Sequence, residues 1–179
     1  MLTLILGGAR SGKSRFAQRL AAQAHRVCFV ATLAPAGDAE MQARVARHQA
    51  DRPASWRTIE EPLALADTVE RAAGDADVVL VDCLTLWLSN LSWEYRAGEP
   101  ARVEEIAQAQ MARIAGAARS CHVILVSNEV GWGIVPESAV ARVFRDVQGF
   151  VNQCAAELAD EVILVVAGLP VDLKGGGGR

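Results

Sequence analysis

Runs of apolar residues with the length of β-strands alternate with longer stretches of helical periodicity along the chain. The apolar runs lie at Leu2–Leu6, Val27–Ala31, Val78–Val81, His122–Val126 and Val162–Val166. Strands that carry apolar residues continuously, rather than at alternate positions, are typical of parallel sheets that are buried on both faces. The pattern therefore predicts an α/β fold with a mostly parallel sheet and helices on both of its faces.

The remaining elements are predicted from periodicity, capping residues and helix breakers. We expect helices over about Ser14–Ala24, Asp38–Ala50, Leu63–Ala73, Ala101–Arg119 and Ser138–Leu158. Short strands are expected at Arg57–Ile59 and Val171–Leu173, whereas Leu84–Gly98 has no clear pattern. Because ligands of parallel sheets bind at the carboxyl ends of the strands, the segments that follow the strands are the first candidates for a site.

The first strand runs directly into a glycine-rich segment with the spacing G-x-x-x-x-G-K-[ST]. Gly7, Gly12, Lys13 and Ser14 occupy the defined positions, and a helical pattern follows. Glycines allow backbone N–H groups to close around a phosphate, the helix N-terminus adds positive potential, and the lysine reaches the β- and γ-phosphates. The segment predicts a nucleoside triphosphate site in which the Ser14 hydroxyl binds Mg²⁺.

Asp82 directly follows the apolar run Val78–Val81. A carboxylate at such a strand end is placed to hold the water shell of Mg²⁺. The alternative is an aspartate that only ends the strand. The glycine-rich loop and Asp82 together indicate a nucleoside triphosphate with Mg²⁺, but they do not define what the triphosphate is used for.

The segment Ala43–Pro53 places a histidine among arginines. On a helix, Arg44, His48 and Arg52 share one face, and Arg47 is adjacent in sequence. The arginine charges favour a neutral imidazole, which is a competent nucleophile toward phosphorus. A solvated basic helix face explains the same residues, and the residue types alone favour this second interpretation.

Two further segments leave alternatives open. Glu60 and Glu61 either accept hydrogen bonds from a ribose or a guanine, or only open the next helix. The loop Ser127–Pro136 carries Asn128 and Glu129 at a strand end. These two residues either contact substrate or metal-bound water, or belong to a structural turn.

Composition narrows the classes of protein. The chain has 179 residues, 51% hydrophobic and 22% charged, which suits one domain over residues 1–173 with a flexible tail at 174–179. The net charge of -3 argues against a protein that coats nucleic acid. No apolar run reaches the roughly 18–20 residues that span a bilayer, and the N-terminus has no signal-peptide pattern. We therefore expect no stable membrane insertion and a cytoplasmic location.

Lysines, histidines and cysteines are few, which limits the candidates for chemistry. Only two of the 18 basic residues are lysines, Lys13 and Lys174, and the second lies in the expected tail. Besides His48 there are His25 and His122, which we expect to be structural. The four cysteines are isolated in the sequence and are expected to be free thiols in a reducing compartment.

Six segments match, in chain order, the motifs of one known family. They are GGARSGKS at Gly7–Ser14, ARVARHQADRP at Ala43–Pro53, WRTIEEP at Trp56–Pro62, VDCLTLWLSNL at Val81–Leu91, SNEVGWGIVPE at Ser127–Glu137 and FRDVQGFVNQ at Phe144–Gln153. The chain thereby resembles the bifunctional adenosylcobinamide kinase / adenosylcobinamide-phosphate guanylyltransferases over essentially its whole length. The glycine-rich loop alone is unspecific, whereas the segments around His48 and at Ser127–Glu137 are specific in combination.

The resemblance implies two reactions in the assembly of the nucleotide loop of cobalamin. First, the γ-phosphoryl group of ATP or GTP passes to the aminopropanol hydroxyl of adenosylcobinamide. Second, GMP from GTP is joined to adenosylcobinamide phosphate through a GMP–histidine intermediate, with release of pyrophosphate. The resemblance also implies a RecA-like P-loop α/β fold and a homotrimer.

Carried over residue by residue, the resemblance makes His48 the guanylyl acceptor, against the interpretation that the residue types alone favour. Lys13 and Asp82 are the other expected catalytic residues, and Ser14 and Asp82 are the expected metal ligands. The expected nucleotide contacts are Gly7, Gly8, Ala9, Arg10, Ser11, Gly12, Lys13, Ser14, Thr32, Leu33, Ala34, Gln49, Ala50, Asp51, Arg52, Glu60 and Asp82. The proton acceptor of the kinase step is open between Asp82, our first choice, and Glu129.

Overall fold

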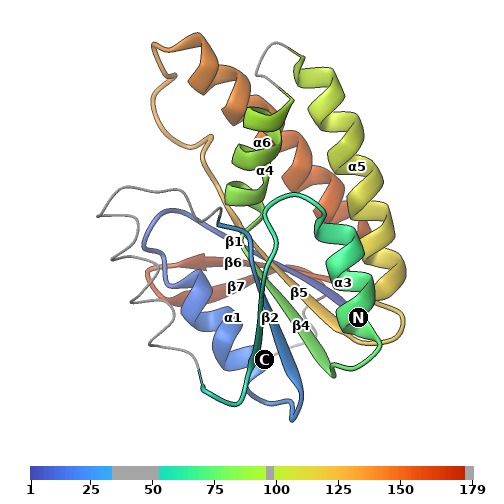
Figure 1. Cartoon of the computed structure of the whole chain (residues 1–179). Helices are drawn as coiled ribbons and strands as arrows, with labels where there is room; N and C mark the ends of the chain where they lie inside the picture. The colour runs from blue at the N-terminus through green and yellow to red at the C-terminus, as the bar shows by residue number, and fades with distance from the viewer. Residues whose placement is uncertain (34–52, 96–98, 176–179) are drawn as a thin grey trace.

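Seven β-strands form one sheet in the computed structural model, which describes residues 1–33, 53–95 and 99–175 (Figure 1). The strands are β1 (Leu2–Gly7), β2 (Val27–Ala31), β3 (Arg57–Glu60), β4 (Val78–Asp82), β5 (His122–Asn128), β6 (Glu161–Val166) and β7 (Leu169–Lys174). The helices are α1 (Lys13–Ala21), α3 (Leu65–Ala73), α4 (Leu84–Glu94), α5 (Pro100–Ala117) and α6 (Ala139–Leu158). The strand order is β3-β2-β4-β5-β1-β6-β7, and only the pair β6–β7 is antiparallel.

Helices cover both faces of this sheet. α1 packs on one face, whereas α3, α4, α5 and α6 pack on the other (Figure 1). In β1, Leu4 belongs to the core under the four helices and Ile5 to the core under α1, and both are fully buried. Because both faces need apolar side chains, the strand carries apolar residues at consecutive positions, Leu4–Leu6, rather than only at alternate ones. The prediction of a mostly parallel α/β sheet is confirmed.

The segment at 84–98, which has no clear sequence pattern, contains the helix α4. Its buried side chains recur at helical spacing: Leu84, Trp87, Leu88 and Leu91. The hydrophobic pattern does not reveal this helix because apolar residues lie on its exposed face as well as on its buried face. Leu86 is half-buried and Trp93 is 87% exposed, so the buried and exposed faces differ little in composition.

The last two strands form a hairpin at the edge of the sheet. Its turn consists of Ala167 and Gly168, whose φ angles of 50° and 82° are both positive, as a two-residue turn of type I′ requires. The strand predicted at residues 171–173 is longer, and Lys174 is its last residue. The Lys174 ammonium donates to the carbonyl oxygens of Ala156 and Glu157 at 3.0 Å each. Lys174 is thus part of the folded sheet edge and not of a tail.

Three other sequence predictions concern features beyond the sheet. The helix predicted over Asp38–Ala50 lies outside the described residues. In the described part of the chain, no helix combines the length and the apolar character that crossing a membrane requires. All four cysteines are described, and each is a free thiol, as predicted.

Candidate active site

The glycine-rich segment Gly7–Ser14 forms the loop that joins β1 to α1. α1 begins at Lys13, and the preceding Gly12 has a φ of 94°, in the left-handed region that favours glycine. Gly12 has no side chain with which to cap the helix, and the first turn of α1 contains no acidic residue. The N–H groups of this turn therefore face the loop without a negative charge beside them, which suits an anion such as phosphate.

Close packing against the β6–β7 hairpin shapes this loop. The N–H of Gly168 donates to the carbonyl oxygen of Ser11 at 2.7 Å. A Cβ atom at Gly7 would lie 2.7 Å from the carbonyl oxygen of Val165, and one at Gly12 would lie 3.2 Å from the Cα of Gly168. Glycine is therefore required at Gly7 for reasons of space, and at Gly12 because of its left-handed backbone, with little room for a side chain.

Lys13 reaches back into the loop that precedes it. The residue is 8% exposed, and its Nζ donates to the carbonyl oxygen of Gly8 at 3.1 Å. Burial lowers the pKa of the Lys13 ammonium, and the nearby Cys83 and Asp82 act in the opposite direction. The lysine predicted to bind the triphosphate is thus held in the loop, within electrostatic range of the strand end at Asp82.

Ser14 and Asp82, the predicted metal ligands, lie at the same edge of the sheet. Ser14 is in the first turn of α1, and Asp82 is the half-buried last residue of β4, which β5 separates from β1. Among the described residues, no group of three or more histidines, cysteines or acidic residues is arranged to hold a metal ion. Mg²⁺ fits this donor set, because it takes few protein oxygens when nucleotide phosphates and water supply the rest.

Thr32, a predicted nucleotide contact, is fully buried at the end of β2. Its Oγ1 accepts a hydrogen bond from the N–H of Cys83 at 2.9 Å and donates one to the Cys83 carbonyl oxygen at 2.7 Å. The carbonyl oxygen of Thr32 accepts from Nδ2 of Asn90 at 2.7 Å. In the structure, Thr32 fixes the backbone that follows Asp82, and a direct contact between Thr32 and a nucleotide stays a prediction.

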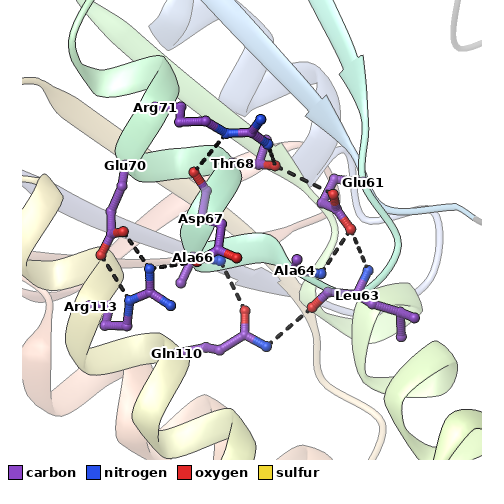
Figure 2. Close-up of polar contacts among 10 residues, drawn as sticks. All are labelled: Glu61, Leu63, Ala64, Ala66, Asp67, Thr68, Glu70, Arg71, Gln110 and Arg113. Carbon is purple, nitrogen blue, oxygen red and sulfur yellow. Dashed lines mark hydrogen bonds and ion pairs between the residues drawn. The ribbon is translucent and has the colours of Figure 1, made fainter.

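The adjacent carboxylates at the end of β3 have different surroundings. Glu61 Oε1 accepts from the N–H groups of Leu63 at 2.9 Å and Ala64 at 2.8 Å, just before α3 (Figure 2). Of the two roles that the sequence leaves open, Glu61 therefore has the structural one: its carboxylate opens the helix that follows. Glu60 is exposed and lies at the register position of Ala31, which in turn is paired with Asp82. Glu60 is thus at the edge where a nucleotide is expected, and its contact with the nucleotide stays a prediction.

Contacts of Arg113 and Gln110, also drawn in Figure 2, fasten α3 to α5. Arg113 of α5 forms ion pairs with Asp67, at 2.6 Å, and with Glu70 of α3. Gln110 accepts from the N–H of Ala66 at 2.9 Å and donates to the carbonyl oxygen of Leu63 at 3.1 Å. This cluster is structural: it secures the helix that Glu61 opens.

Asn128 and Glu129 lie beside the phosphate loop. Asn128 is the register partner of Gly7, and the N–H of Glu129 donates to the Gly7 carbonyl oxygen at 3.1 Å. Asn152 of α6, which the sequence patterns do not single out, donates to Glu129 Oε1 at 2.9 Å. The available signal is a pair of amides, Gln148 and Asn152, at i and i+4 on the buried face of an amphipathic helix.

Six predicted site residues lie outside the described residues: Ala34, His48, Gln49, Ala50, Asp51 and Arg52. Leu33 is half-buried directly after β2. The other two histidines lie where strands begin, at the amino edge of the sheet. His25 is exposed before β2, and Nε2 of His122, at the start of β5, lies 2.9 Å from Oγ1 of Thr3. Neither is placed to reach a nucleotide at the carboxyl edge.

A glycine loop at a helix N-terminus, a buried lysine within it and a carboxylate at a nearby strand end define a P-loop nucleotide-using α/β protein. Comparison with protein families identifies which one. The family model described as cobinamide kinase / cobinamide phosphate guanyltransferase matches residues 3–173. The chain belongs to this family, and it is an enzyme with these two activities.

Three relatives are similar to the chain over nearly their whole length. The bifunctional adenosylcobalamin biosynthesis protein CobP of Pseudomonas aeruginosa is 48% identical over 176 residues, which cover 98% of each chain. The bifunctional adenosylcobalamin biosynthesis proteins CobU of Escherichia coli and Salmonella typhimurium are 40% and 42% identical. Each of these two matches covers 97% of this chain and 100% of the relative.

Proposed function

We propose that the chain carries out two consecutive reactions on adenosylcobinamide in adenosylcobalamin biosynthesis. In the first, the aminopropanol hydroxyl attacks the γ-phosphorus of ATP or GTP. A new O–P bond forms, the bond from the γ-phosphorus to the bridging oxygen breaks, and the nucleoside diphosphate leaves. The product is adenosylcobinamide phosphate.

The second reaction transfers GMP through His48. A neutral imidazole nitrogen attacks the α-phosphorus of GTP, and the bond to the bridging oxygen breaks to release pyrophosphate. A phosphate oxygen of adenosylcobinamide phosphate then attacks the same phosphorus, and the N–P bond breaks. Protonation makes the imidazole nitrogen a good leaving group, and adenosylcobinamide-GDP is released.

The observation that carries this proposal is the buried Lys13 ammonium, held inside the loop at the N-terminus of α1. Both reactions need a triphosphate fixed in place, and positioning with charge compensation dominates catalysis of phosphoryl transfer. The N–H groups of Gly7–Ser14 and the ammonium supply such compensation. Ser14 and Asp82 would hold Mg²⁺, which supplies further positive charge to the triphosphate when bound.

Three broader features belong to the same proposal. The P-loop fold is of the RecA-like form, a view supported by the position of β5 between the phosphate-loop strand β1 and the strand that ends at Asp82. The enzyme works as a homotrimer in the cytoplasm, which the family resemblance supports. Glu60, exposed at the carboxyl edge, accepts hydrogen bonds from the ribose or the guanine of GTP.

Intact-mass spectrometry after mixing with GTP and Mg²⁺ tests the nucleotidyl step. We expect a GMP-sized increment that is labile in acid and stable in alkali. His25→Asn is the matched control, because His25 is an exposed histidine at the opposite edge of the sheet, and this variant should still be labelled. His48→Asn should remain unlabelled, and labelling of that variant would refute the assignment. If cobinamide is phosphorylated but no GMP adduct of the protein forms, the nucleotidyl step through a histidine is refuted and only the kinase activity is supported.

A further inference from the structure

Three polar side chains that these reactions do not use form a buried network between β5 and α6. Ser127 and Gln148 are 0% exposed, and Asn152 is 5% exposed. Asn152 Oδ1 accepts from Ser127 Oγ at 2.6 Å and from Gln148 Nε2 at 3.0 Å. Gln148 Nε2 also donates to Ser127 Oγ at 3.1 Å. Polar groups on the buried face of a helix need such partners, because unpaired they destabilise the fold.

The amide nitrogen of Asn152 extends the network to the active site. Nδ2 donates to the carbonyl oxygen of Asn128 at 3.0 Å and to Glu129 Oε1 at 2.9 Å. The Asn152 oxygen accepts two hydrogen bonds and its nitrogen donates two, so only one orientation of the amide satisfies all four partners. A buried amide with a single satisfied orientation holds the Glu129 carboxylate in a fixed place.

Glu129 is thereby held beside the phosphate loop from two directions. Its backbone N–H is bonded to the Gly7 carbonyl oxygen, and its carboxylate is bonded to Asn152. Because β5 lies between β1 and β4, Glu129 extends the strand between the phosphate loop and Asp82. It follows the register partner of Gly7 by one residue and that of Asp82 by three. The residue is half-buried, and Oε2 has no hydrogen-bond partner among the described residues, so this oxygen is available as an acceptor.

The two candidate proton acceptors differ in their surroundings. Asp82 lies within electrostatic range of the Lys13 ammonium, which the proposed function assigns to the triphosphate. Asp82 is also a proposed ligand of Mg²⁺. The hydrogen bond that Glu129 receives comes instead from the uncharged Asn152 amide. Glu129 is therefore held beside the phosphate loop without being committed to the metal or to the lysine.

We propose that Glu129, and not Asp82, receives the proton of the substrate hydroxyl in the kinase step, and that Asn152 is the positioning residue that holds its carboxylate. This inference rests on the proposed function. As the hydroxyl oxygen bonds to the γ-phosphorus, its proton passes to Glu129 Oε2, and the nucleoside diphosphate leaves with the electron pair of the broken bond. Guanylyl transfer involves no such proton, because its nucleophiles are a neutral imidazole nitrogen and a phosphate oxygen. The second activity is thus an internal control for the first.

Glu129→Gln tests the proton acceptor, because it retains the volume of the side chain and an oxygen for the bond from Asn152. In the full-length enzyme, kcat for phosphorylation of adenosylcobinamide should fall about 100-fold or more, the range of a general base, while KM changes less than about threefold. The rate of GMP attachment without cobinamide should stay within about twofold of the wild type. An unchanged kinase kcat overturns the proposal, and so does an equal loss of both activities.

Asn152→Ala tests the positioning role. Its kinase kcat should fall about 10-fold with little change in KM, because Glu129 remains but is no longer held. Gln153→Ala is the matched control, since within the described part of the chain this neighbouring exposed amide bonds only to its own helix, at the Gly149 carbonyl oxygen, 3.4 Å away. GMP attachment shows that each variant is folded. Parallel loss of both activities in Asn152→Ala, or no loss, overturns the positioning role, whereas a wild-type enzyme lacking either activity refutes the proposed function itself.

Discussion

Replacing Thr32 with valine removes one hydroxyl beneath the active site while the shape of the side chain is kept. This hydroxyl both accepts from the N–H of Cys83 and donates to the Cys83 carbonyl oxygen. After the substitution, the carbonyl oxygen keeps the hydrogen bond from the N–H of Trp87 at 3.2 Å. The Cys83 N–H has no second partner among the described residues, so it would be buried and unpaired.

The expected magnitude follows from these two contacts. A buried N–H left without a partner costs about 1–3 kcal/mol, and the lost bond to the carbonyl oxygen adds about 0.5–1.5 kcal/mol. We therefore expect Thr32→Val to lower the free energy of unfolding by about 2–4 kcal/mol. Thr32→Ser is the control: it keeps the hydroxyl and loses one buried methyl group, worth about 1 kcal/mol.

Urea unfolding followed by tryptophan fluorescence measures the stability of the variants, and calorimetric titration with GTP measures their nucleotide affinity. Stability should fall in the order wild type, Thr32→Ser, Thr32→Val. If Thr32→Val is as stable as the wild type within about 0.5 kcal/mol but binds GTP more weakly, the reasoning is wrong. The hydroxyl would then contact the nucleotide, as the family resemblance predicts, and would not be committed to Cys83.

Three further predictions test other parts of the structure. Lys13→Met removes the ammonium from the loop and should weaken GTP binding about 10- to 100-fold, since hydrogen bonds to charged groups contribute about 1.5–3 kcal/mol; an unchanged Kd in calorimetry contradicts the site. Ala167 has a φ of 50° in an exposed hairpin turn, so Ala167→Asn should raise the free energy of unfolding in urea by about 0.5–1 kcal/mol, and a decrease contradicts the turn geometry. The Arg26 guanidinium holds the pKa of Asp77 below its ordinary value of 3.8, so the stability from this pair is present above that pH and is lost as the pH falls through the lower, folded-state pKa. Asp77→Asn should therefore lose less stability than the wild type on acidification below about pH 4. Circular dichroism at decreasing pH measures this loss, and the same acid-unfolding curve for both proteins would contradict the prediction.

Signals that are local in sequence predict much of this molecule. The apolar runs locate the parallel strands, and the spacing of Gly7, Gly12 and Lys13 locates the phosphate loop at a strand end. The shape of that loop is a different matter, because it depends on Val165 and Gly168, about 150 residues further along the chain. No local pattern marks residues whose importance comes from what they contact after folding.

Buried polar residues show the same limit. Glu61 has two interpretations in the sequence, and only its hydrogen bonds to the N–H groups before α3 decide between them. Thr32 at a strand end is expected to contact a ligand, yet its hydroxyl is bonded within the protein. Asn152 is found only through its partners, although an amide on an apolar helix face is itself a clue. The placement of His48 stays a prediction.

The packing of the phosphate loop has a consequence for biosynthesis on the ribosome. Residues 7–14 are made early, but among the described residues β1 pairs only with β5 and β6, and the loop closes against Gly168. A nascent chain has no partner strand for β1 until translation has passed residue 122. A ligand stabilises only the state that binds it, so nucleotide protects chains whose synthesis has passed the β6–β7 hairpin. We therefore expect the proposed nucleotide binding to protect finished chains from proteolysis better than truncated ones.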